Sequence, residues 1–95
     1  MTLDGKLAHI RLIGDASEGA PGCKSPILVK HARNMQEGAA AQKIWLAEHF
    51  PKYRLIEHAL AKPDESGRRM EAYLIADALE RERYICFDIT DHFGL

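Results

Sequence analysis

The chain has 95 residues, 46% of them apolar and 28% charged, with a formal net charge of −1. This length and balance indicate one globular domain spanning residues 1–95 and exclude a chain that is disordered throughout. The near-zero charge argues against a general nucleic-acid binder. With no signal peptide and no apolar run of about 20 residues, a cytoplasmic protein without a membrane partner is expected.

The first third of the sequence predicts two strands. Residues 7–13 alternate in part and are rich in β-branched side chains, and residues 14–22 carry the turn formers of a loop. Residues 27–29 then predict a second strand, paired with the first in a hairpin. A helix over 26–33 is the alternative, because Ser25 and Pro26 also fit a helix start. The β-branched Ile27 and Val29 favour the strand.

Residues 34–50 predict the main helix. Asn34 and Glu37 have the spacing of a capping box, and Pro51 should end the helix at Phe50. An arc of about 60° holds the apolar stripe expected to face a sheet, formed by Met35, Ala39, Leu46 and Phe50. Trp45 lies outside this arc. Either the N-terminal segment covers it, or it contacts a partner.

Three further strands are predicted, over residues 53–62, 69–77 and 84–90. A turn at 63–67 joins the first two, since Pro63 fixes φ and Gly67 permits a positive φ. The stretch 69–83 has high helix propensity, so a second helix there is the alternative, but it would lack a clean apolar face. In the last strand, Ile85, Phe87 and Ile89 share one side. The tail over residues 91–95 is expected to pack loosely.

The predicted fold class is therefore α+β: an antiparallel sheet in the order β-β-α-β-β-β, with one main helix packed on one face. The last three strands carry apolar residues on both faces, and one helix covers only one of them. The second face is therefore predicted to bind a protein partner, most simply a second copy in a homodimer. The alternative is that the N-terminal hairpin folds over this face. The residues assigned to this contact are Trp45, His58, Tyr73, Ile75 and Tyr84.

No family resemblance and no cofactor motif is found, and the chain is interpreted as a non-enzymatic interaction or assembly module. Two alternatives stay open. A small metal-dependent enzyme would use Asp88, Asp91 and His92, because carboxylates and an imidazole ligate divalent metals. A nucleic-acid-binding module would use local basic groups, at Lys30, Arg33, Arg68 and Arg69. Of the two cysteines, Cys86 is predicted to be a small buried hydrophobe and Cys23 to lie in a loop. A disulfide between them stays open, because two cysteines alone make no framework.

Overall fold

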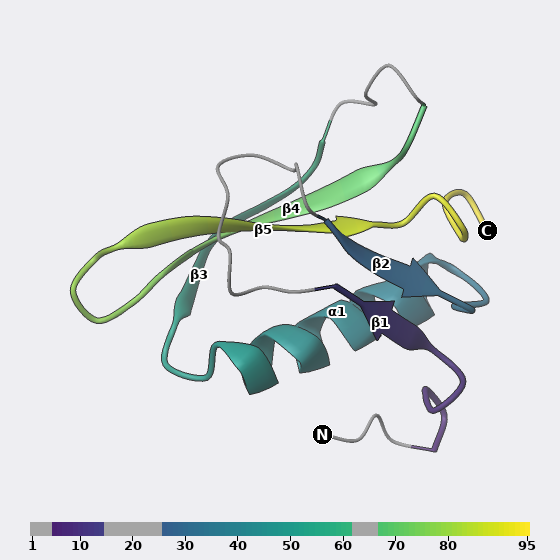
Figure 1. Cartoon of the computed structure of the whole chain (residues 1–95), viewed down its shortest axis with the longest axis horizontal. Helices are drawn as coiled ribbons and strands as arrows, with labels where there is room; N and C mark the ends of the chain where they lie inside the picture. Colours follow the sequence, from purple (N-terminus) through teal and green to yellow (C-terminus); the bar gives the residue numbers. More distant parts are fainter. Residues whose placement is uncertain (1–4, 15–25, 62–66) are drawn as a thin grey trace.

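The computed structural model describes residues 5–14, 26–61 and 67–95. These residues form an α+β fold with the predicted order of elements, and both segments with a helical alternative are strands (Figure 1). The elements are β1 (Arg11–Ile13), β2 (Ile27–Lys30), α1 (Met35–His49), β3 (Arg54–Leu60), β4 (Met70–Ala76) and β5 (Glu82–Asp88). The loop predicted over 14–22, Cys23, and most of the turn at 63–67 lie outside the described residues.

The sheet is mixed, so the prediction of a purely antiparallel sheet is wrong. Its strands lie in the order β1-β2-β5-β4-β3, and β2 pairs with β5 in parallel, with Ile27 opposite Phe87. The other neighbours are antiparallel. The reason is topological. The helix between β2 and β3 returns the chain to its starting end, so β3 runs in the direction of β2, and two reversals later β5 does too.

The helix begins as the sequence predicts. The Asn34 side chain accepts a hydrogen bond from the Glu37 N–H at 2.9 Å. The Glu37 carboxylate turns back one residue further than a capping box requires and accepts from the Arg33 N–H at 2.9 Å. This bond, the contact with His9 and the Arg33 charge hold the Glu37 pKa below its usual value.

The predicted sheet-facing stripe of α1 is wrong. The buried helix residues are Gly38, Ala41, Gln42 and Trp45, which follow the i, i+3, i+4, i+7 pattern on a neighbouring arc. Small residues bring the helix close to the sheet, and Trp45 contacts Phe87 edge-on, with ring centroids 5.5 Å apart. Met35, Leu46 and Phe50 pack at the margins of this contact, only partly buried.

The length of the first strand and the packing of the C-terminal tail differ from prediction. The first strand is only three residues long, because residues 7–10 close a turn in which the Ile10 N–H donates to the Leu7 carbonyl at 3.0 Å. Leu7 and Ile10 are buried in the core. The C-terminal tail, predicted to pack loosely, is held at two points: His92 is fully buried against Gly38, and the Leu95 carbonyl accepts from the Met35 N–H at 3.3 Å, while the Leu95 side chain is exposed.

The turn between β4 and β5 explains why residues 69–83 are not helical. The Asp77 carboxylate accepts from the backbone N–H groups of Leu79 and Arg81, each at 2.9 Å, and from the Arg81 guanidinium at 2.6 Å. These bonds lower the Asp77 pKa and give the backbone a local alternative to the helix. The predicted face of β5 is confirmed, with Ile85, Phe87 and Ile89 all in the core.

A bulge in β3 changes which residues face α1. Leu55 lies opposite Ile75 and Glu57 opposite Leu74, so Ile56 is an extra residue in β3. As a result Leu55 faces α1, on the same side as His58 and Leu60. These two residues lie opposite Tyr73 and Glu71 of β4. Simple alternation predicts Leu55 on the other side.

Candidate functional site

A cluster of polar side chains is buried between α1 and the β3–β4 half of the sheet. Gln42 is fully buried at the centre of the helix. Its amide oxygen accepts from the Tyr73 hydroxyl at 2.8 Å, and its amide nitrogen donates to the Glu71 carboxylate at 3.4 Å. The other Glu71 oxygen contacts His58 Nε2. Each of these buried polar groups therefore has a partner, as burial requires.

The cluster fixes the side chain of His58 on the outer strand. The imidazole stacks on the Tyr73 ring, with centroids 4.1 Å apart and planes 7° from parallel, while Glu71 holds its Nε2. Burial raises the pKa of the Tyr73 hydroxyl, and the nearby Glu71 charge raises it further. Tyr73 thus stays protonated and acts as a hydrogen-bond donor in the core, with His58 held flat above it.

The strand that carries His58 is the outermost strand of the sheet. All seven residues of β3 are exposed, although its partner strand β4 is mostly buried. Its large apolar side chains are exposed to 53% at Leu55, 38% at Ile56 and 52% at Leu60. An outer strand also presents unpaired backbone N–H and C=O groups, which makes it a template for pairing with another strand.

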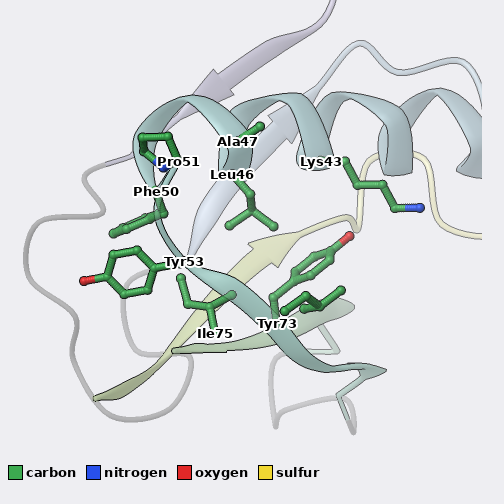
Figure 2. Close-up of a pocket in the computed structure, with 9 residues that line it drawn as sticks. Lys43, Leu46, Ala47, Phe50, Pro51, Tyr53, Tyr73 and Ile75 are labelled. Atoms are coloured by element: carbon green, nitrogen blue, oxygen red, sulfur yellow. The ribbon is translucent and has the colours of Figure 1, made fainter. Parts of the chain in front are cut away.

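A cavity of about 290 Å³ opens between the C-terminal half of α1 and strands β3 and β4. Figure 2 shows the Phe50 and Tyr53 rings at one end, and the Lys43 amine and Tyr73 hydroxyl toward the other. The apolar side chains of Leu46 and Ile75 lie between these ends. The remaining lining residues are Ala47, Pro51 and Leu55. Among the described residues of this lining, only Lys43 is charged.

The structure distributes the predicted partner-binding residues over two sides of the sheet. Trp45, Tyr73 and Ile75 are buried in the core between α1 and the sheet, and His58 lies above Tyr73 on the same side. Tyr84 and His58 are the exposed members of the set, and Tyr84 lies opposite Leu74 on the face away from α1. On that face Met70, Ala76 and Cys86 are buried. Cys86 is not a free thiol.

The residues predicted for a metal site do not converge. Asp88 lies on the face away from α1 and accepts from the Thr90 N–H and hydroxyl. Asp91 accepts from the His31 N–H at 3.2 Å, and His92 is buried on the α1 side. Over residues 5–14, 26–61 and 67–95, no three His, Cys, Asp or Glu side chains are grouped to hold a metal ion.

Two of the predicted basic residues, Arg33 and Arg69, make side-chain contacts with nearby residues. Arg33 pairs with Glu37 at 3.5 Å, and the Arg69 guanidinium lies 4.8 Å from the centre of the Phe93 ring. Lys30 ends β2 opposite Arg11, while Arg68 is exposed just before β4.

Sequence reasoning missed the buried polar cluster. The sequence pattern predicts no role for Gln42 or Glu71, yet they link α1, β3 and β4. The helical periodicity does indicate burial of Gln42, which falls between Gly38 and Trp45 on one helical face. The sequence gives no such indication for Glu71, because only the sheet register places it opposite Phe87 and Leu60.

The comparisons give no relative from which a function can be transferred. No family model, curated protein or solved structure matches the chain. No helix among the described residues has the length and apolar character needed to cross a membrane.

Proposed function

We propose that this chain is an assembly module that forms a homodimer by pairing the β3 strands of two copies. The observation that carries the proposal is the exposure of Leu55, Ile56 and Leu60 along an outer strand of seven residues. Pairing with a further strand satisfies the open backbone groups of β3 and removes these side chains from water.

A second copy is the occupant that the pattern of β3 fits best. Leu55, His58 and Leu60 all face α1, and the bulge at Ile56 spaces them evenly along the register with β4. A two-fold axis perpendicular to the sheet and midway between the two copies of His58 therefore places Leu55 of one copy opposite Leu60 of the other. On the other face it places Glu57 opposite Ala59, so no two carboxylates oppose each other.

The same arrangement limits assembly to two copies. The other outer strand, β1, is only three residues long, and a very short edge strand discourages pairing. A two-fold contact between β3 strands uses both long edges and leaves only β1 exposed, so the assembly closes. With a net charge of −1, the two copies repel each other weakly.

Sedimentation equilibrium of the wild type, Leu60→Lys and Ile13→Lys tests the proposal. The two substitutions are matched, because Leu60 is 52% exposed on β3 and Ile13 is 54% exposed on β1. Covering half of a leucine is worth about 1 kcal/mol, and the two-fold axis doubles it, so Leu60→Lys should weaken dimerisation roughly 30-fold. Ile13→Lys should dimerise like the wild type.

One strand edge is smaller than the roughly 800 Å² per partner of a standard interface, so a micromolar or weaker dissociation constant is expected. The titration must therefore reach about millimolar protein. A wild type that stays monomeric there would refute the proposal. So would a dimer that Leu60→Lys leaves unchanged, which would instead direct attention to Tyr84 and the face away from α1.

A further inference from the structure

The cavity beside β3 has a chemistry of its own. Its lining is aromatic and aliphatic over most of its length, and Lys43 is the only charged residue that the described part of the chain contributes to it. Lys43 forms no ion pair with any described residue. The Lys43 amine and the Tyr73 hydroxyl lie toward one end, away from the Phe50 and Tyr53 rings (Figure 2). The cavity thus joins an apolar body to a single cationic group.

The Tyr73 hydroxyl does not compete with Lys43 for an anion. It already donates to the Gln42 oxygen at 2.8 Å, and Gln42 in turn donates to Glu71. The Glu71 carboxylate is occupied by His58 and Gln42. The polar cluster therefore satisfies its own groups, and the Lys43 amine remains as the group available to an incoming ligand.

Size restricts the class of ligand. At about 290 Å³ the cavity is at the lower limit of small-molecule sites, which span about 300–1,000 Å³. A phospholipid or a dinucleotide exceeds this volume. A short aliphatic or aromatic chain with one terminal anion fits both the volume and the single charge.

We propose that this cavity binds a small amphipathic carboxylate, with its apolar chain against Leu46, Phe50 and Ile75 and its carboxylate at Lys43. The inference goes beyond the homodimer, because the ligand occupies the space between α1 and the sheet, not the strand edge. Charge complementarity supplies the preference for an anion, and the apolar walls supply most of the contact area.

Titration of the protein with octanoate and octan-1-ol, followed by amide chemical shifts in NMR spectra, tests this inference. The two probes share a chain and differ in charge. Octanoate should bind more tightly than octanol, with shift changes concentrated at the cavity residues. Lys43→Gln should weaken octanoate binding roughly tenfold and leave octanol binding unchanged, since a charged hydrogen bond is lost. Lys52→Gln, at an exposed lysine outside the cavity lining, is the matched control.

Filling the cavity gives a second variant. Ala47 is exposed on α1 and lines the cavity, so Ala47→Trp should fold normally and exclude both probes. Repeating the titrations in Leu60→Lys separates the two proposals, because this change alters the strand edge outside the lining. The inference fails if neither probe shifts the cavity residues, or if octanoate binding is unaffected by Lys43→Gln. Neither result bears on whether β3 dimerises.

Discussion

Replacing Gly38 with alanine should destabilise the protein, although the same change stabilises most helices. Inside a helix, alanine is favoured over glycine by about 0.5–1 kcal/mol. Here a Cβ at position 38 would lie 2.2 Å from His92 Nε2 and 2.7 Å from its Cε1. Overpacking of a tight site costs about 1–3 kcal/mol. The net loss in free energy of unfolding should therefore be about 1–2 kcal/mol.

Thermal and urea denaturation, followed by circular dichroism, measure this loss. For a chain of this size, it corresponds to a fall in Tm of roughly 5–15 °C. The decisive control is Gly38→Ala in a His92→Ala background, where the ring is absent and alanine should stabilise the helix by about 0.5–1 kcal/mol. If Gly38→Ala raises the stability of the wild type, His92 does not pack against α1 as described.

Two further predictions concern the buried polar groups. Burial lowers the pKa of His92 below its ordinary value of 6.5, against the opposing charges of Glu71 and Asp91, so the unfolded chain binds more protons there. The stability that comes from keeping His92 uncharged in the folded protein is thus fully present above pH 6.5 and is lost as the pH falls through the lowered pKa. Neither ring nitrogen of His92 has a partner among the described residues, so His92→Leu should be neutral or stabilising at pH 7. In urea unfolding from pH 8 to 5, the free energy of unfolding of this variant should depend less on pH than that of the wild type. An unchanged pH dependence would contradict this. Tyr73→Phe should cost about 1–3 kcal/mol in urea unfolding, because it leaves the buried Gln42 oxygen unpaired, and a neutral effect would show that this bond is not made.

The elements of the fold were predictable where local chemistry decides them. Asn34 and Pro51 set the ends of α1 within a residue, and alternation placed Ile85, Phe87 and Ile89 in the core. Turn chemistry at Asp77 outweighed the helix propensity of residues 69–83. The parallel pairing of β2 with β5 was not predictable from periodicity, because it follows from the path of the whole chain.

The candidate site was harder to predict for two physical reasons. The bulge at Ile56 turns Leu55 to the face of the sheet opposite to the one that simple alternation predicts. No residue type in β3 indicates a bulge at this position. Hydrophobicity alone predicts the wrong buried stripe on α1, because it disfavours burial of Gln42. This residue is buried because it accepts a hydrogen bond from Tyr73 and donates one to Glu71. The sequence leaves Trp45 open to a partner contact, because the Phe87 ring that packs against it belongs to a strand distant in the sequence.

Amide hydrogen exchange of β3, measured as a function of protein concentration, tests the pairing of two outer strands most directly. In a monomer, the N–H groups of β3 that point away from β4 exchange rapidly at every concentration. We predict that these alternate amides become protected as the concentration rises, while the amides of β1 do not change. Protection that is independent of concentration, or that rises around Tyr84 instead of along β3, would contradict the account.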